Sequence, residues 1–359
     1  MESRTDDIAL EIDEELLDDG AYITYDIATY PSDFTLSGIV DMWNDGDIKI
    51  PDFQREYVWT IKQASLLIES FLLGLPVPPV FFYIDEQNKN LVIDGQQRIL
   101  STVFYFGGYF GSENLQGKRQ VFRLQGLDER SPYHKKTFEE LDDSSQRKLK
   151  STVLRAINIR QLSPIGEGTS AFHIFERLNT GGTPLKSQEI RNVVFRGEFV
   201  NVLRDLNQNE HWRLILGNQK LNKHQVDVEL VLRLFAFRNG SSEYEKPMKE
   251  FLNKAMKRNQ SGNTADVNDF RSYFPEVASF IIDHLGEKPF HLRGRLNTSA
   301  LDSVFTITRQ NFQRLPNDYT DRFRRLTQDD RFHELTTIGT TDTSSVKARF
   351  ELVEQYLID

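Results

Sequence analysis

A change of hydrophobic periodicity near residue 163 constrains the fold of this 359-residue chain more than any other feature of its sequence. Before this point, short runs rich in β-branched and aromatic residues alternate with segments of helical spacing. After it, apolar residues recur almost only at the three- and four-residue intervals of amphipathic helices. We therefore expect an α+β fold, with a mixed α/β domain over residues 31–163 followed by an all-helical domain over residues 164–359.

The expected elements follow from the same periodicities. In the first domain, helices are expected over 35–45, 60–74 and 96–106, and strands over 80–84, 91–93, 120–124 and 155–162. Thr60 and Gln63 have the spacing of a capping box at the start of one helix, and Gly74 stops that helix. The polar turn between strands 80–84 and 91–93 predicts a hairpin. In the second domain, helices are expected over 171–178, 186–195, 199–206, 226–237, 244–257, 267–285, 299–312 and 343–357.

The acidic charge of the chain is concentrated at its N-terminus. The net charge is −9, but residues 1–47 carry fourteen acidic residues against the single base Arg4, which leaves 43 bases and 39 acids elsewhere. We expect residues 1–30 to form a flexible acidic arm in front of a mildly basic body. The arm is either a solubilising tail or a nucleic-acid mimic that covers a basic site, and the charge pattern favours the tail.

Composition excludes several classes of site. The chain has no cysteine, so disulfides, thiolate zinc sites and cysteine nucleophiles are excluded. No apolar run approaches the roughly 18 residues of a membrane span. The acidic N-terminus also lacks the basic start and apolar stretch of a signal peptide. We therefore expect a cytoplasmic protein without a membrane partner.

The strongest candidate for chemistry is the turn Asp94-Gly95-Gln96-Gln97-Arg98, which lies between an expected strand and an expected helix. The first amides of a helix lack internal partners and lie at the positive end of its dipole, so the turn can bind an anion. Gly95 lets a phosphate approach the backbone, and Arg98 can pair with phosphate oxygens. Gln96 and Gln97 can position a water or read a base, and Asp94 can hold a magnesium ion or orient Arg98. The alternative, in which Asp94 caps the helix and Arg98 makes a structural ion pair, fits these residues equally well.

Two further segments are weaker candidates. Gln54 and Arg55 lie among aromatic residues just before a capped helix, where Arg55 would be a second phosphate clamp beside a base-stacking ring. A hydrophobic staple with Arg55 stacked on Trp59 is slightly favoured there. The other segment is an expected loop between two helices, made of Asn179, Thr180, Gly181 and Gly182. It can form an amide-rich nest for an anion, although a helix C-cap followed by an N-cap is favoured on the residues alone.

Together these segments resemble the N-terminal domain of GmrSD-type restriction endonucleases, a prokaryotic family with a ParB/sulfiredoxin-like core. The resemblance rests on five blocks, IPDFQREYVW at 50–59, LLGLPVPPV at 72–80, VIDGQQR at 92–98, FERLNTGGTPL at 175–185 and SQEIRN at 187–192. The blocks follow in the family's order over about 150 residues.

The resemblance implies a role in defence against foreign or modified DNA, with the DGQQR motif binding and hydrolysing a nucleotide. It makes Asp94, Gly95, Gln96, Gln97 and Arg98 the phosphate and hydrolysis site. It places Gln54 and Arg55 beside that site, with the loop of Asn179, Thr180, Gly181 and Gly182 facing the same cleft. We therefore expect a nucleoside triphosphatase that uses Mg²⁺, held in part by Asp94, and acts with DNA or with a separate nuclease or defence subunit.

The chain departs from many relatives in one respect. Its seven histidines are scattered, without the paired His and Asn of an HNH nuclease, so we expect sensing and hydrolysis without that module. One alternative is a metal-dependent DNA nickase in which Asp94 binds the metal and basic residues such as Arg293 and Arg322 follow the DNA backbone. Acidic neighbours dilute those bases. Another alternative is a non-enzymatic DNA-binding module masked by its acidic arm.

Overall fold

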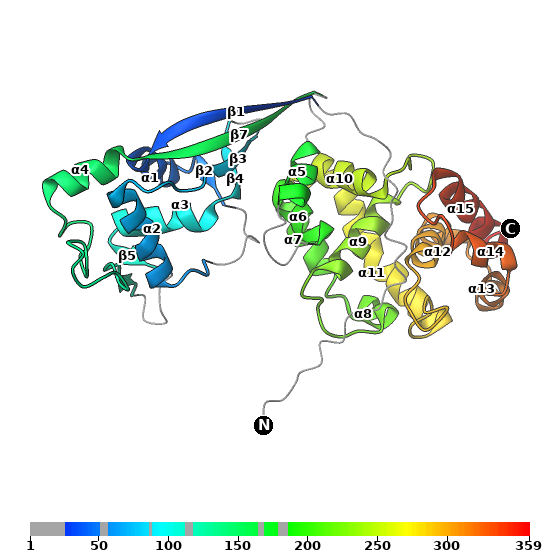
Figure 1. The fold of residues 1–359 in the computed structure, drawn as a ribbon. Helices are drawn as coiled ribbons and strands as arrows, with labels where there is room; N and C mark the ends of the chain where they lie inside the picture. The colour runs from blue at the N-terminus through cyan, green and yellow to red at the C-terminus, as the bar shows by residue number, and fades with distance from the viewer. Residues whose placement is uncertain (1–25, 51–56, 86–87, 112–117, 164–168, 179–185) are drawn as a thin grey trace. The chain divides into compact units, whose positions relative to one another are not determined.

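The protein consists of two compact units. The computed structural model describes residues 26–50, 57–85, 88–111, 118–163, 169–178 and 186–359. The first unit ends with helix α5 (Ser170–Leu178), and the second begins with helix α6 (Ser187–Val194) (Figure 1). A mixed sheet with helices is followed by helices alone, so the expected α+β class is confirmed. The ParB/sulfiredoxin-like assignment stays a prediction.

A five-stranded mixed sheet of order β1-β7-β3-β4-β2 is the frame of the first unit. Its strands are β1 (Asp26–Thr35), β2 (Ile48–Lys49), β3 (Val80–Ile84), β4 (Asn90–Asp94) and β7 (Val153–Ser163). The pairs β1/β7 and β3/β4 are antiparallel, whereas β3/β7 and β2/β4 are parallel. The expected hairpin is therefore β3–β4. A separate two-stranded ribbon joins β5 (Tyr109–Phe110) to β6 (Gln120–Val121).

Two strands differ in extent from the expectation. Residues 26–30, expected in the acidic arm, lie in β1, where Tyr30 pairs with Asn158 of β7. β1 is an edge strand, which tolerates polar residues and Pro31, so its composition does not distinguish it from an unstructured segment. Strand β6 ends at Val121, short of the expected residue 124, and the amide of Leu124 donates to the carbonyl of Lys136 at 3.0 Å. The rest of the predicted arm lies outside the described residues.

The helices of the first unit pack beside this sheet. They are α1 (Leu36–Asn44), α2 (Ile61–Leu73), α3 (Gln96–Phe106), α4 (Asp143–Ser151) and α5. α3 contacts both α1 and α2, and Figure 1 shows the three helices on the same side of the β1–β7 ribbon. The predicted capping box is present, since Gln63 Oε1 accepts a hydrogen bond from the amide of Thr60 at 2.9 Å. Buried side chains from these helices and the sheet form one core, which includes Ile68, Phe82 and Ile99.

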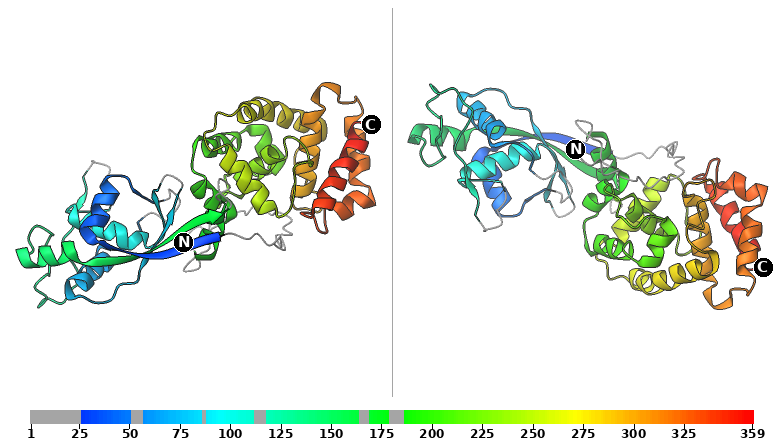
Figure 2. Two further views of the ribbon diagram at one scale, coloured as in Figure 1. Left: turned by 90° about the horizontal axis from the view of Figure 1, so that it is seen from above. Right: turned by 90° about the horizontal axis from the view of Figure 1, so that it is seen from below.

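The second unit is helical throughout its described residues. Its further helices are α7 (Glu198–Leu206), α8 (Glu210–Leu216), α9 (Val226–Ala236), α10 (Met248–Arg258), α11 (Ala265–Leu285), α12 (Thr298–Gln310), α13 (Tyr319–Thr327), α14 (Asp330–Leu335) and α15 (Thr343–Leu357), with a 3₁₀ turn η1 (Phe312–Arg314). α15 contacts α12, α13 and α14, and these orange and red helices lie side by side in both views of Figure 2. A second, separate core surrounds Trp212 and Phe274.

The division between the units lies later in the chain than the expected boundary after residue 163. Helix α5, expected in the helical domain, contacts β4 and belongs to the first unit, so the division falls between α5 and α6. Among the residues that the structure describes, no helix has the length and apolar character of a membrane span.

Candidate functional site

Strand β4, a left-handed glycine and helix α3 form the turn that the sequence singled out. β4 ends at Asp94, and Gly95 is the N-cap of α3 with φ 98° and ψ 10°. The amide of Ile99 donates to the carbonyl of Gly95 at 3.0 Å, as expected for the first bond of a helix. Gly95 provides no side-chain cap, so the preceding amides of the helix are not satisfied by the N-cap residue. The turn therefore has the polarity of an anion site.

Two independent constraints require glycine at residue 95. Its positive φ lies in the left-handed region, which disfavours a side chain. The backbone of Gly95 also packs against buried Val80, at the start of β3. A Cβ added at Gly95 would lie 2.8 Å from the Val80 Cβ and 3.2 Å from its Cα. The close contact of the turn with β3 therefore fixes where the helix begins.

Arg98 is held in place by two acceptors. Its Nη2 donates to Asp94 Oδ2 at 2.8 Å and to the carbonyl of Pro79 at 3.2 Å. The Arg98 side chain is 16% exposed and that of Asp94 is 60% exposed. Buried Nε of Arg98 has no hydrogen-bond partner among the described residues. Asp94 therefore orients Arg98 instead of capping the helix, and Arg98 keeps an unsatisfied donor.

Gln97 joins the turn to the segment that precedes α2. Its Oε1 accepts hydrogen bonds from the amides of Val58 and Trp59 at 3.1 and 3.2 Å. This contact joins segments that are 39 residues apart in the sequence. The oxygen of Gln97 is thus engaged by backbone, a role that the sequence did not reveal.

Tyr57 forms a second link between the same segment and α3. Its hydroxyl is hydrogen-bonded to Ser101 Oγ at 2.8 Å, and its ring meets those of Phe104 and Phe110 edge-on. Burial raises the pKa of Tyr57 to about 12. Ser101 in turn donates to the carbonyl of Gln97 at 2.6 Å. The segment 57–59 is therefore fastened to the first turns of α3 through side chains on one face of that helix.

The remaining predicted site residues lie outside the described residues. These are Gln54, Arg55, Asn179, Thr180, Gly181 and Gly182. The structure places the elements that border them in sequence. Tyr57 follows Arg55 by two residues and is bound to α3. Helix α5, which precedes Asn179, contacts β4.

The donor set at the turn fits a magnesium ion that is shared with phosphates. Mg²⁺ is commonly bound by one or two carboxylates together with substrate phosphate oxygens and water. Asp94 offers an exposed carboxylate at the edge of the turn. Within the described ranges, no three His, Asp or Glu side chains gather into a cluster that would hold a metal by themselves.

Several residues that shape the turn were not predicted as site residues. Pro79 and Val80 belong to the LPVPPV block, which the sequence marked only as part of a family pattern. In the structure, Pro79 accepts from Arg98 and Val80 packs against Gly95. The joint occurrence of that block and the Gly95 turn in the sequence was the signal that could have marked Pro79 and Val80 as site residues.

The last of the five blocks, SQEIRN, has a structural role. Arg191 of α6 is buried, and its Nε donates to Asn253 Oδ1 of α10 at 2.9 Å. Its Nη1 donates to Glu229 Oε2 of α9 at 2.7 Å and to Gln188 Oε1 at 3.3 Å. This network fixes α6 between two helices of the second unit.

A protein-family model matches part of the chain. The model described as GmrSD restriction endonuclease, N-terminal domain, matches residues 36–196. The match begins at α1, contains the Asp94–Arg98 turn and ends just after α6. The resemblance drawn from the sequence blocks is thereby confirmed. No curated protein matches the chain.

Proposed function

We propose that the chain, whose residues 36–196 match the GmrSD restriction endonuclease N-terminal domain model, is a restriction-type defence protein that binds and hydrolyses a nucleoside triphosphate at the Asp94–Arg98 turn. The observation that carries this proposal is the start of α3, where a left-handed glycine provides no side-chain cap and Arg98 lies one turn along. Backbone amides, the helix dipole and a guanidinium then act on the same anion.

Arg98 is prepared for a phosphate by its present contacts. Asp94 and the carbonyl of Pro79 share its Nη2, which fixes the plane of the guanidinium. Nε has no acceptor among the described residues, and a buried unsatisfied donor costs about 1–3 kcal/mol. A phosphate oxygen that displaced the atoms covering Nε would remove that cost and gain a charge-assisted bond.

The other residues of the turn take separate tasks in this proposal. Gln97 holds the segment 57–59, and Gln96 at the first position of α3 would orient the attacking water. Asp94 would contribute an oxygen to Mg²⁺, which supplies charge neutralisation on the phosphates when bound. Arg55 would be a second phosphate contact.

The loop of Asn179, Thr180, Gly181 and Gly182 would add backbone amides to the same phosphates. The family match suggests that the protein interacts with DNA. We propose that hydrolysis is coupled to DNA or to a separate nuclease or defence subunit.

The test is a titration of ATP, GTP, CTP and UTP with Mg²⁺ against the wild type and Arg98→Ala, followed by an assay of phosphate release. Loss of a charge-assisted hydrogen bond is worth about 1.5–3 kcal/mol, so Arg98→Ala should weaken binding by roughly 10- to 100-fold. Phosphate release should fall with it.

Arg322→Ala is a matched control. Arg322 also pairs with the aspartate four residues before it, Asp318, at 2.7 Å and also donates to one backbone carbonyl, that of Tyr356. Its side chain is 21% exposed and that of Asp318 is 52% exposed, close to the values at the turn. Nucleotide affinity should be unchanged in this variant. Absence of binding by all four triphosphates, or equal losses in both variants, would reject the site.

A further inference from the structure

Two loops of the second unit carry positive charge with little compensation. Residues 217–225 join α8 to α9, and residues 286–295 lie between α11 and α12. We call them together the basic loop pair. The first loop has no acidic residue, and the second has only Glu287. The exposed bases of the pair are Lys220, Lys223, Lys288, Arg293 and Arg295.

The two loops are neighbours in space. The amide of Lys288 donates to the carbonyl of Leu214, in the last turn of α8, at 3.3 Å. The methylene chain of Lys288 crosses Gly217, where an added Cβ would lie 2.8 Å from the Lys288 Cδ. Helices α8 and α11, which precede the loops, also contact each other. The charges of the two loops therefore belong to one surface.

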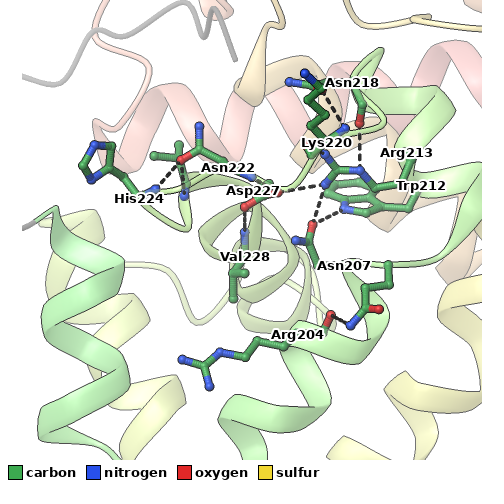
Figure 3. A network of polar contacts seen from close by, with 12 residues as sticks. Arg204, Asn207, Trp212, Arg213, Asn218, Lys220, Asn222, His224, Asp227 and Val228 are labelled. Atoms are coloured by element: carbon green, nitrogen blue, oxygen red, sulfur yellow. Dashed lines mark hydrogen bonds and ion pairs between the residues drawn. The ribbon is translucent and has the colours of Figure 1, made fainter. Parts of the chain in front are cut away.

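A buried network fixes the backbone of the first loop (Figure 3). Arg213 and Asp227 form an ion pair at 2.8 Å, with side chains 4% and 1% exposed. Arg213 also donates to the carbonyls of Asn218, at 2.8 Å, and of Lys220. Asp227 Oδ2 also accepts a hydrogen bond from the amide of Asn222 at 3.0 Å. The backbone that carries Lys220 and Lys223 is therefore ordered before any ligand binds, which lowers the entropic cost of binding.

Four bases of this surface have no acidic partner among the described residues. Among the described residues, no ion pair involves Lys220, Lys223, Lys288 or Arg293. Several other cations of the unit are paired with aspartates, in Arg238–Asp266, Lys246–Asp342, Arg309–Asp269, Arg322–Asp318 and Arg324–Asp321. The dilution of basic residues by acidic ones, evident in the sequence, therefore applies to α13 and not to the basic loop pair.

The pKa of a histidine in the second loop is affected by one of these lysines. His291 lies in the second loop, and its imidazole is partly buried. Burial and the ammonium of Lys288 lower the pKa of His291 below its ordinary value. The basic loop pair thus combines an ordered backbone with lysines that have no ion pair among the described residues.

We propose that the basic loop pair binds the phosphate backbone of duplex DNA. Lysines on an ordered backbone contact phosphates as point charges and position a duplex without reading its sequence. Binding of single strands relies on exposed aromatic platforms, and the one aromatic carbocycle of these loops, Phe290, is fully buried. This surface is distinct from the Asp94–Arg98 turn, so the proposal holds whether or not that turn binds a triphosphate.

The test is the salt dependence of binding to a fluorescent duplex of about 25 base pairs, measured by anisotropy without nucleotide. The variant replaces Lys220, Lys223, Lys288 and Arg293 by Gln. Each phosphate contact contributes about 0.9 to the slope of log affinity against log salt, so four contacts give a wild-type loss of roughly 100-fold between 50 and 200 mM KCl. The variant should bind weakly at 50 mM and lose most of that slope.

The control removes the same number of charges from paired positions, with Lys246, Arg309, Arg322 and Arg324 each replaced by Gln. In each of these ion pairs the aspartate is more than half exposed, so the pairs contribute little to stability, and the control should remain folded and keep its DNA affinity. Equal weakening of the two variants would mean that net charge alone drives binding and would overturn the proposal. Tighter binding to a single strand or to an RNA duplex would overturn it as well. The assay contains no nucleotide, so its outcome does not depend on binding at the Asp94–Arg98 turn.

Discussion

At the scale of single residues, Gly95 decides whether β4 and α3 can meet at the proposed site. Its left-handed backbone and its close contact with Val80 each disfavour a side chain at this residue, and the free-energy cost of each can be measured. Gly74 offers the comparison, because it has φ 77° at the end of α2 and open space where a Cβ would be. The pair of glycines therefore separates conformational strain from steric overlap.

We expect Gly74→Ala to lower the free energy of unfolding by about 1–2 kcal/mol, the cost of a left-handed residue with a side chain. Gly95→Ala should cost about 1–3 kcal/mol more, because the new methyl overlaps Val80. Urea unfolding of both variants gives the two values. Equal losses of unfolding free energy in the two variants would show that the turn accommodates the added methyl without a steric cost.

Tyr57 gives the site a dependence on alkaline pH. Its pKa in the folded protein is about 12, above its ordinary value of 10.0, because the ring is partly buried. The folded state therefore holds the phenolic proton more tightly than the unfolded state. The associated stability is complete below pH 10 and is lost as the pH rises from 10 through about 12.

The variant Tyr57→Phe isolates this effect. At pH 8 it should be less stable than the wild type by about 0.5–1.5 kcal/mol, because the hydrogen bond to Ser101 is missing. Phenylalanine does not titrate, so the difference in unfolding free energy should shrink between pH 10 and 12. Denaturant unfolding at a series of pH values measures it, and a difference that stays constant over this range would contradict the prediction.

At the scale of secondary-structure elements, the Arg213–Asp227 pair holds α8, α9 and their connecting loop together. Removal of one partner leaves a buried charge without its counterion. Arg213→Met should therefore lower the unfolding free energy by about 3–5 kcal/mol. Amide exchange at residues 218–222 should also accelerate, because the loop carbonyls lose their donor.

The double variant Arg213→Met/Asp227→Leu provides the complementary measurement. It removes both charges, so part of the lost stability should return, while the loop should stay fast-exchanging. If the loop amides of either variant exchange as slowly as those of the wild type, the pair does not order the loop.

The elements also differ in how far their sequences could define them. α2 and α3 were predictable, because a capping box, a terminal glycine and an apolar stripe all agree. α4 and α13 were not expected, because few of their residues are apolar, and α8 and α14 were not expected, because six or seven residues carry too few turns for a clear period. β1 was partly missed because its pairing with β7 joins residues more than a hundred positions apart.

The candidate site shows the same limit. The strand–glycine–helix turn was predictable, because strand, glycine and helix signals are adjacent in sequence. The tether from Gln97 to Val58 and the bond from Arg98 to Pro79 were not, because both join a side chain to backbone in a distant segment. Local patterns specify the turn, whereas tertiary contacts specify its neighbours.

At the scale of the whole molecule, each unit has its own hydrophobic core, and no buried residue is shared between them in the described chain. We therefore expect two separable unfolding transitions. Gly95→Ala should lower the midpoint of the first unit alone and Arg213→Met that of the second alone, by about 2–4 °C for each kcal/mol lost.

Tryptophan fluorescence can assign the transitions. Trp43 and Trp59 lie in the first unit, and Trp212 is buried in the core of the second. In a Trp212→Phe background, thermal unfolding followed by fluorescence reports the first unit only. A midpoint that moves in this background with Arg213→Met would show that the two units unfold as one.

The position of α6 has a consequence for how such proteins can be divided. The family match ends at residue 196 and includes α6, yet two acceptors of Arg191 lie on α9 and α10, beyond that limit. A fragment cut at the end of the match would carry a buried guanidinium without Asn253 and Glu229. The end of the family match and the boundary between the two units are therefore different positions in the chain. Any chimera that keeps Arg191 has to include hydrogen-bond acceptors for its guanidinium.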